Sequence, residues 1–373
     1  MQVVLVQRIF AHYRAALLKL LLQECSVKLI LVGDTHSGNS GIKCWDVPAD
    51  RFRRAPIRLA VGNLVYQAGL LRLGLDPKIH CIIYEGNPYY ISTWLSAMLA
   101  RICGKRVLFW THGWLSRETG IKRLIRKCFY RIPHALLLYG DYAKAIGLEM
   151  GFSPNRLHVI YNSLDYDAQK ELREALVCVD HRATRARLFS NPDLPLVICT
   201  ARLIRACRFD LLIEAQALLS AEGHLVNVLL VGDGPERKAL EQMAAERSLS
   251  VAFCGECHDE EVLARLYVAA TVTVSPGKVG LTAIHSMTYG VPVITHDDPA
   301  HQGPEWEAIN PGLTGDFFRR NDARDLANVI RRWTREITPP ESVRRACYAV
   351  IEAKYNPHAH AEAIKRAVVG LRP

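Results

Sequence analysis

A glycine-rich turn before a helix pattern is the part of the sequence best suited to hold an anion. Ser275–Thr295 reads SPGKVGLTAIHSMTYGVPVIT, and its Gly277 and Gly280 separate an apolar strand pattern from a helix pattern. The first N–H groups of a helix have no partner inside it, and the helix dipole favours negative charge there. Lys278 adds a cation to the turn. The segment therefore predicts a phosphate or diphosphate site, and it contains no obvious nucleophile.

Three further strand ends carry residues that could complete such a site. Arg202 follows the apolar run LVICTA and could pair with a diphosphate, although a solvated loop charge is the simpler interpretation of that residue alone. Gly232, in LLVGDGPERKAL, would let a ligand approach closely, although most such turns only reverse the chain. Gly255 lies in the third segment, FCGECHDEE. Each of these signals is weak when it is taken alone.

Apolar runs rich in Val, Ile and Leu alternate with helix patterns along the whole chain. The first series is QVVLVQ, VKLILVGD, HCIIYEG, RVLFWTHG, ALLLYGD and LHVIYN, and the second is LVICTAR, VNVLLVGDG, VAFCG, VTVSPG and VPVIT. Continuous apolar strands indicate sheets that are buried on both faces. Two strand–helix series predict an α/β protein with two Rossmann-like, doubly wound domains, whose ligands bind at the carboxyl ends of the strands.

The order and spacing of these motifs are much more specific than any one of them. LVGDGPERKALE, F-x-G-x-x-x-D-E-E, the glycine turn, the PE that ends His301–Glu305 and GLTGDFF together resemble the carboxyl-terminal domain of retaining glycosyltransferase family 4. The resemblance runs from about Leu196 to about Arg332. The first half is similar more loosely, through THG at Thr111–Gly113 and YNSLD at Tyr161–Asp165.

The resemblance implies the GT-B fold, in which two Rossmann-like domains face each other across a cleft. We expect an acceptor and membrane-facing domain over residues 1–170, a nucleotide-sugar domain over 171–348, and a final helix over 349–373 that crosses back to the first domain. The implied reaction moves a sugar from a UDP- or GDP-linked donor to a lipid-linked saccharide or similar acceptor in cell-surface polysaccharide synthesis. It retains the anomeric configuration and uses no metal and no cofactor.

The resemblance also assigns roles to individual residues. The amides of the helix that starts after Gly280 and the charge of Arg202 would hold the donor's diphosphate, so that catalysis depends on charge stabilisation and positioning. The implied catalytic residues are Arg202, His112 and His285. The implied donor-binding residues are Gly232, Gly255, Gly280, Leu281, Thr282, His285 and Glu305, and we add Lys278 of the glycine turn to them.

Three positions depart from the family pattern. The family has glutamates where this chain has Gly277 and His285, and a diphosphate-binding lysine where it has Cys207. A neutral imidazole at 285 could still bond a ribose hydroxyl, and Lys278 could supply the missing charge. The alternative function is a catalytically impaired GT-B protein that binds a nucleotide sugar or a partner without transfer.

The segment Cys254–His258, CGECH, also matches the attachment motif of c-type haem and a redox CxxC pair. Short motifs of this kind recur by chance, and by resemblance this loop shapes the pocket for the nucleotide base. We expect neither haem nor zinc here. The eleven cysteines are scattered singly and predict buried, reduced thiols.

The basic charge is concentrated in the first half of the chain. Residues 1–170 contain 23 Lys or Arg and 11 Asp or Glu, a balance of 23−11=+12 against +10 for the whole chain. Ile121–Pro133 reads IKRLIRKCFYRIP, in which apolar residues 121, 124, 125, 128, 129 and 132 share one helical face that we expect to pack inward. The opposite face would be solvated or meet an anionic membrane surface. The basic residues of that face are Lys122, Arg123, Arg126, Lys127 and Arg131.

Acceptor-side residues are expected after the first and third apolar runs. His12 and Tyr13 suit a phosphate-bearing, lipid-linked acceptor, and Asn87 lines the acceptor cleft or forms an Asn-Pro turn. The first residues show no signal-peptide pattern and no apolar run long enough to span a membrane. We therefore expect a cytoplasmic protein, peripheral on the inner face of the plasma membrane. We expect no nucleic-acid partner, because no recognition module or interleaved aromatic motif accompanies the basic residues; salt-sensitive binding without donor affinity would favour one.

Overall fold

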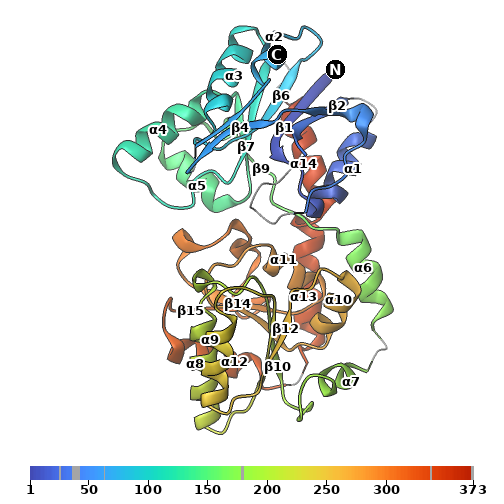
Figure 1. The fold of residues 1–373 in the computed structure, drawn as a ribbon, viewed down its shortest axis with the longest axis vertical. Helices are drawn as coiled ribbons and strands as arrows, with labels where there is room; N and C mark the ends of the chain where they lie inside the picture. Colours follow the sequence, from blue (N-terminus) through green and yellow to red (C-terminus); the bar gives the residue numbers. More distant parts are fainter. Residues whose placement is uncertain (25–26, 36–42, 63, 178–179, 337, 371–373) are drawn as a thin grey trace. The chain divides into compact units, whose positions relative to one another are not determined.

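The computed structural model describes residues 1–24, 27–35, 43–62, 64–177, 180–336 and 338–370. The chain divides into two compact units (Figure 1). Unit 1 comprises Met1–Asp165 and Asn356–Pro373, and unit 2 comprises Tyr166–Tyr355. In the described part of the chain, no helix combines the length and the apolar character needed to cross a bilayer.

Unit 1 is built on a seven-stranded, entirely parallel sheet in the order β3-β2-β1-β6-β7-β8-β9. Its strands are β1 (Gln2–Ile9), β2 (Lys28–Asp34), β3 (Phe52–Arg54), β6 (Cys81–Glu85), β7 (Arg106–Thr111), β8 (Ala135–Leu138) and β9 (Leu157–Val159). A separate antiparallel hairpin pairs β4 (Ile57–Val61) with β5 (Leu64–Gln67).

Unit 2 contains a six-stranded parallel sheet in the order β12-β11-β10-β13-β14-β15. Its strands are β10 (Leu196–Thr200), β11 (Asn227–Val231), β12 (Val251–Gly255), β13 (Val272–Ser275), β14 (Val293–His296) and β15 (Gly315–Phe318). Numbered within the sheet, this is the 3-2-1-4-5-6 order of a Rossmann fold, and it reverses between β10 and β13.

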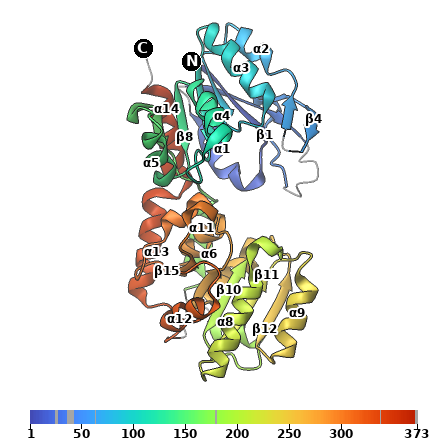
Figure 2. The same cartoon turned by 90° about the vertical axis from the view of Figure 1, so that its left-hand side faces the viewer.

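Helices cover both faces of each sheet (Figures 1 and 2). Those of unit 1 are α1 (Ala15–Gln23), α2 (Leu71–Leu75), α3 (Ile91–Ile102), α4 (Gly120–Arg131), α5 (Asp141–Glu149) and α14 (Pro357–Val369). Those of unit 2 are α6 (Tyr166–Ala175), α7 (His181–Ala186), α8 (Phe209–Ala221), α9 (Arg237–Glu246), α10 (Glu260–Val268), α11 (Leu281–Thr288), α12 (Ala323–Trp333) and α13 (Glu341–Lys354).

The strands are apolar throughout because each sheet has a hydrophobic core on both faces. In β1, Val4 and Val6 belong to one core of unit 1, and Val3 and Leu5 belong to the core on the opposite face. Successive side chains of a strand point to opposite faces, so only a continuous apolar run can fill both cores. The prediction of doubly wound sheets from these runs is confirmed.

Helix α4 corrects one sequence-based expectation. Its first residues do not pack inward, because Ile121, Leu124 and Ile125 are 76%, 61% and 47% exposed. Of the predicted inward stripe, Phe129 is fully buried and Ile132 packs on the same core, whereas Cys128 is exposed. The amphipathic pattern correctly predicted a helix, but within α4 only the last turn packs on the sheet.

The cysteines agree in part with the expectation of buried thiols. All nine cysteines that the structure describes are free thiols, and Cys81, Cys199 and Cys347 are buried. Burial raises the pKa of the Cys81 thiol to about 12, which makes it a poor nucleophile. The expectation of burial is wrong for Cys103, Cys128 and Cys254, which lie at the surface.

A buried histidine makes unit 1 sensitive to acid. His360 of α14 is 1% exposed, its Nδ1 lies 3.0 Å from the Ser163 hydroxyl, and its ring packs edge-on against Trp110. Burial, with the charge of Arg14 as a smaller cause, lowers the pKa of His360 from 6.5 to about 3. Between pH 6.5 and 3 the histidine is therefore protonated in the unfolded chain and neutral in the folded chain. The free energy of unfolding decreases as the pH falls through this range.

We therefore predict that His360→Asn reduces the acid sensitivity of unit 1. The native histidine should contribute a loss of ~2 kcal/mol between pH 6.5 and 5, because one pH unit corresponds to about 1.4 kcal/mol. Denaturant titrations of both proteins at pH 7 and pH 5 measure the difference. The same pH dependence in the variant and in the native protein would contradict the assignment.

Candidate functional site

The glycine turn and Arg202 follow the two strands at which the order of the unit 2 sheet reverses. Arg202 lies two residues beyond β10, and Gly280 is the N-cap residue of α11, a few residues beyond β13. The Thr282 hydroxyl in the first turn of α11 donates a 2.9 Å hydrogen bond to the carbonyl of Thr200, the last residue of β10. This bond ties the start of α11 to the strand end that carries Arg202.

This region has free donors and free positive charge. The amides of Gly280, Leu281 and Thr282 donate no hydrogen bond to any acceptor that the structure describes. The side chains of Arg202 and Lys278 are exposed, and each lacks an ion-pair or hydrogen-bond partner among the described residues. Unpaired helix-start amides beside unpaired cations are the usual components of an anion site.

A buried glutamine that sequence reasoning missed braces the glycine turn. Gln302 is 2% exposed and accepts a 2.8 Å hydrogen bond from the Val279 amide. Its own amide donates to the Thr295 hydroxyl and the His296 carbonyl, both at 2.9 Å. Gln302 therefore fixes the turn to the end of β14. Only its place before the PE motif could have drawn attention to it in the sequence.

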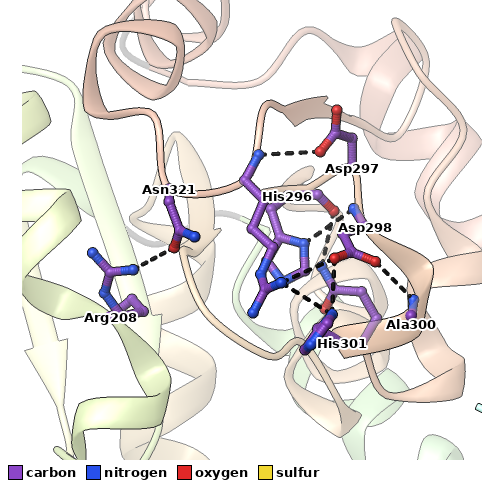
Figure 3. A network of polar contacts seen from close by, with 9 residues as sticks. Arg208, His296, Asp297, Asp298, Ala300, His301 and Asn321 are labelled. Carbon is purple, nitrogen blue, oxygen red and sulfur yellow. Dashed lines mark hydrogen bonds and ion pairs between the residues drawn. The ribbon is translucent and has the colours of Figure 1, made fainter.

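The loop after β14 that carries Gln302 is itself held by a polar network (Figure 3). Asp298 accepts from the Ala300 amide at 3.1 Å and lies 2.8 Å from the His301 imidazole. The Asp297 carboxylate accepts from the Arg320 amide at 3.1 Å. Glu305, at the end of this loop, is 4% exposed, and its Oε2 would lie 3.9 Å from a Cβ placed on Gly280. The structure thus brings Glu305 beside the glycine turn.

Two of the departures from the family pattern are neighbours in space. A Cβ placed on Gly277 would lie 2.1 Å from the Ala206 carbonyl oxygen and 2.8 Å from the Cys207 backbone. Any residue larger than glycine at 277 therefore collides with the short helix η5 (Arg205–Cys207). The residues at 207 and 277 therefore depend on each other: the backbone of Ala206 and Cys207 fills the space that a side chain at position 277 would need.

The cation next to Cys207 does not replace the missing lysine. The guanidinium of Arg208 pairs with Asp210 at 3.0 Å and also bonds Asn321 (Figure 3). The Cys207 thiol is half-buried, and burial raises its pKa, so it supplies no charge either. Among the described residues of this part of the site, Arg202, Arg205 and Lys278 have exposed side chains without an ion-pair partner.

Gly232 and Gly255 lie together at the ends of β11 and β12. The Gly232 amide donates a 2.7 Å hydrogen bond to the Gly255 carbonyl. Gly255 has a φ of +75°, a conformation that residues with a Cβ rarely adopt. A Cβ on Gly232 would lie 2.0 Å from the Ala201 carbonyl oxygen, so the group that approaches Gly232 closely is the backbone before Arg202.

His285 lies one helical turn beyond Leu281 and is largely enclosed. Its side chain is 14% exposed, and its ring lies 4.7 Å from Tyr267 and 5.7 Å from Tyr289 between ring centroids. Its Nε2 lies 2.8 Å from the Glu260 carboxylate. That nitrogen is therefore engaged inside the protein. Sequence reasoning named His285 but did not identify Glu260 as its partner.

The CGECH segment lies largely at the surface. Cys254 is exposed, Cys257 is partly exposed, and the imidazole of His258 pairs with Glu256 at 2.8 Å. Among the residues that the structure describes, no group of three or more His, Cys, Asp or Glu side chains is arranged to hold a metal ion.

In unit 1, the predicted acceptor residues follow the strands at which that sheet reverses, β1 and β6. His12 and Tyr13 form the short helix η1 (His12–Arg14) directly after β1. Asn87 follows β6, and its side chain accepts a 3.0 Å hydrogen bond from the Tyr89 amide, which is the Asn-Pro turn interpretation. His112 follows β7, is exposed, and has its ring 4.8 Å from that of Tyr139.

Arg14, the last residue of η1, is partly buried next to His12 and Tyr13. It donates to the Tyr139 hydroxyl at 2.6 Å and to the Gln7 side chain at 2.9 Å, and it lies 5.4 Å from the Trp110 ring. These contacts order the residues after β1, so Arg14 is a positioning residue of this edge.

Comparisons with known proteins find glycosyltransferases. Residues 180–350 match the family model of glycosyl transferases group 1. The chain is 29% identical over 150 residues to a lipopolysaccharide core biosynthesis glycosyltransferase of Rhizobium meliloti, a match to 40% of this chain and 42% of that protein. It is 28% identical over 172 residues to a GDP-mannose-dependent phosphatidylinositol dimannoside mannosyltransferase of Mycobacterium tuberculosis, a match to 44% and 42%. Each match spans less than half of the relative's length.

Solved structures show the fold. HepE of Anabaena in complex with UDP is similar over 100% of both chains, with a TM-score of 0.70 and 15% identity. The lipopolysaccharide outer core galactosyltransferase WaaB is similar over 99% of both chains, with a TM-score of 0.69 and 14% identity. The chain therefore has the GT-B fold that the resemblance implied.

We predict that restoring the family residue, Gly277→Glu, destabilises unit 2. A collision with the 206–207 backbone should cost ~3 kcal/mol, which lowers Tm by about 5–10 °C. Thermal unfolding without ligand measures the change, and Lys278→Glu, which adds the same carboxylate at the exposed neighbouring position, is the control. An unchanged Tm in the Gly277 variant would show that η5 does not pack against the turn.

Proposed function

We propose that this protein is a retaining glycosyltransferase of family 4 that uses a UDP- or GDP-linked sugar. The single observation that carries the proposal is the set of unpaired first-turn amides of α11 next to Arg202. The match to the group 1 family model over residues 180–350 supports it.

The chemistry follows from where negative charge grows. As the bond between the sugar and the donor diphosphate breaks, the leaving diphosphate gains charge, and preorganised donors at that place lower the barrier. Arg202, Lys278 and the amides of Gly280, Leu281 and Thr282 would meet this charge, so the proposal requires no metal ion. In a front-face reaction the leaving phosphate itself takes the acceptor's proton, which accounts for the absence of a nucleophile from the motif. His112 is proposed to lie near the transferred sugar.

The departures at Cys207, Gly277 and His285 keep the alternative open as an outcome of the test. A catalytically impaired protein would bind a nucleotide sugar and neither hydrolyse nor transfer it.

We predict that Arg202→Ala lowers kcat/KM for the true donor by at least about 100-fold, as expected when one preorganised donor to a developing charge is lost.

Lys278→Ala should weaken donor binding by about tenfold, the effect of one charge-assisted hydrogen bond. Thermal shift with a panel of UDP-, GDP- and ADP-sugars first identifies the donor, because a ligand stabilises the fold in proportion to its binding.

Arg247→Ala is the matched control for these variants, because Arg247 is an exposed arginine of unit 2 whose side chain, among the described residues, bonds the Met243 carbonyl of the preceding helix and nothing else. Full activity in Arg202→Ala would refute the role of Arg202. Donor binding without hydrolysis or transfer in the native protein would favour the binding-protein alternative.

We further propose that the acceptor is lipid-linked and that unit 1 meets an anionic membrane surface. The two relatives named above act in lipopolysaccharide core synthesis and on a phosphatidylinositol dimannoside, according to their names. Residues 57–131 contain 12 Lys or Arg and 3 Asp or Glu, a balance of 12−3=+9 in a chain of +10. Each well-placed basic residue adds about 1 kcal/mol of attraction to an anionic leaflet.

The apolar side chains of this region support insertion as well as charge attraction. Of the twenty exposed large apolar side chains in the described part of the chain, thirteen lie between Leu59 and Ile125. Helix α3 exposes Ile91, Leu95, Met98 and Ile102 along one face, and Ile102 is 83% exposed. Helix α2 and strand β5 pack against α3. The rings of Trp94 in α3 and Phe129 in α4 lie 4.8 Å apart between centroids, so these elements adjoin (Figures 1 and 2).

The basic residues of this surface differ from the expected set at one position. Arg126 forms a bidentate ion pair with Glu118, with its shorter contact at 2.6 Å, and its side chain is 21% exposed. This pairing withdraws Arg126 from the surface. Lys122, Arg123, Lys127 and Arg131 remain beside the exposed stripe of Ile121, Leu124 and Ile125. An amphipathic helix of this kind lies in the membrane interface.

We predict that the native protein floats with vesicles containing phosphatidylglycerol at low salt and releases at high salt. The double variant Ile121→Ser, Leu124→Ser should lose most of this binding, and Lys122→Glu, Arg123→Glu should lose its salt-sensitive part. Leu225→Ser, Leu313→Ser is the control, because both leucines are 50% exposed on unit 2. No flotation at low salt, or equal flotation of all variants, would defeat the proposal.

A further inference from the structure

Glu260 is a charged side chain to which neither the motifs nor the proposed reaction assigns a role. It is the first residue of α10 and follows the N-cap residue Asp259, next to the segment 254–258 that the resemblance places beside the nucleotide base. Its carboxylate is partly buried, with 35% of the side chain exposed.

One oxygen of this carboxylate is saturated with hydrogen bonds. Oε1 of Glu260 lies 2.8 Å from His285 Nε2. It also accepts hydrogen bonds from the Tyr289 hydroxyl at 2.6 Å and from the side-chain amide of Gln169 at 3.2 Å. Three donors from α11, its C-cap and α6 therefore hold the side chain in one orientation. Burial opposes the charge of Glu260, but these hydrogen bonds keep its pKa below the ordinary value. The group is thus an ionised, acceptor-only side chain.

The other oxygen, Oε2, has no hydrogen-bond partner among the residues that the structure describes. An ionised oxygen that is partly exposed and fixed in direction suits a ligand with neighbouring hydroxyl groups. Its environment is unlike that of a surface glutamate, because the aromatic rings of Tyr267 and Tyr289 flank the histidine that holds it.

The position of Glu260 relative to the anion site sets the class of ligand. His285 lies four residues after Leu281 and therefore on the same face of α11, one turn or about 6 Å along the helix axis. Glu260 is bonded to His285 at that level. The ribose of a nucleoside diphosphate is joined directly to its α-phosphate, so phosphates at the first turn of α11 would leave the ribose within a few ångströms, about the length of one helical turn. The base would then lie towards the loop 254–259.

We propose that Glu260 binds the ribose hydroxyls of the donor nucleotide through Oε2, and that His285 positions this carboxylate. The inference rests on the proposed function, because it takes the diphosphate to lie at α11. The ribose-binding carboxylate would thus come from α10, and His285 of α11 would hold it in place. His285 is then a positioning residue, and Glu260 contacts the substrate.

The test is a double-mutant cycle between the protein and the nucleotide. Calorimetry measures the Kd of UDP and GDP, and then of the 2′,3′-dideoxy form of whichever binds, for the native protein and for Glu260→Gln. The native protein should lose roughly ten- to a hundredfold in affinity for the dideoxy nucleotide. Glu260→Gln should bind the ordinary nucleotide correspondingly more weakly, and it should hardly distinguish the two forms.

Two matched variants separate ligand binding from a purely structural role. Glu261→Gln removes the same charge from the same turn at an exposed position and should behave as the native protein does. Tyr289→Phe removes one of the bonds that hold Oε1 and should lower Tm while it keeps the distinction between the nucleotides. If Glu260→Gln lowers Tm but still distinguishes the two nucleotides as the native protein does, the inference is wrong and the proposed function stands. If the native protein binds no nucleoside diphosphate, both are wrong.

Discussion

The candidate site depends on the adjacency of two parallel strand ends. β10 and β13 are hydrogen-bonded neighbours, and the sheet order reverses between them, which is where open α/β sheets bind their ligands. The bond from the Thr282 hydroxyl to the Thr200 carbonyl fixes the start of α11 beside this edge. The backbone of Arg202 and the free amides of α11 therefore lie at the same edge of the sheet.

The fold could be predicted because its determinants are local. Continuous apolar runs indicate strands buried on two faces, and Gly280 before Leu281 indicates the start of a helix. Neither signal depends on distant parts of the chain. The direction of an amphipathic helix is not local. The pattern of α4 is the same whether its apolar stripe meets a sheet or solvent, and only the extent of the sheet decides that Phe129 is buried and Ile121 is not.

The parts of the site that the sequence did not reveal are contacts between distant segments. Gln302 reaches Val279 across 23 residues, and Glu260 reaches His285 across 25. Gly277 and Cys207 each look like a lost functional group when they are considered singly. In the structure they are adjacent, and the missing Cβ makes room for the Ala206 carbonyl. A departure from a family motif therefore has to be judged together with the residues that share its space.

The central claim is that the first turn of α11 holds the diphosphate of a nucleotide sugar. A crystal structure of the protein with its best-binding nucleoside diphosphate tests this most directly. We expect diphosphate oxygens within hydrogen-bonding distance of the amides of Gly280, Leu281 and Thr282 and of the Arg202 guanidinium. A nucleotide whose diphosphate is bound elsewhere, with Arg202 left in solvent, would contradict it.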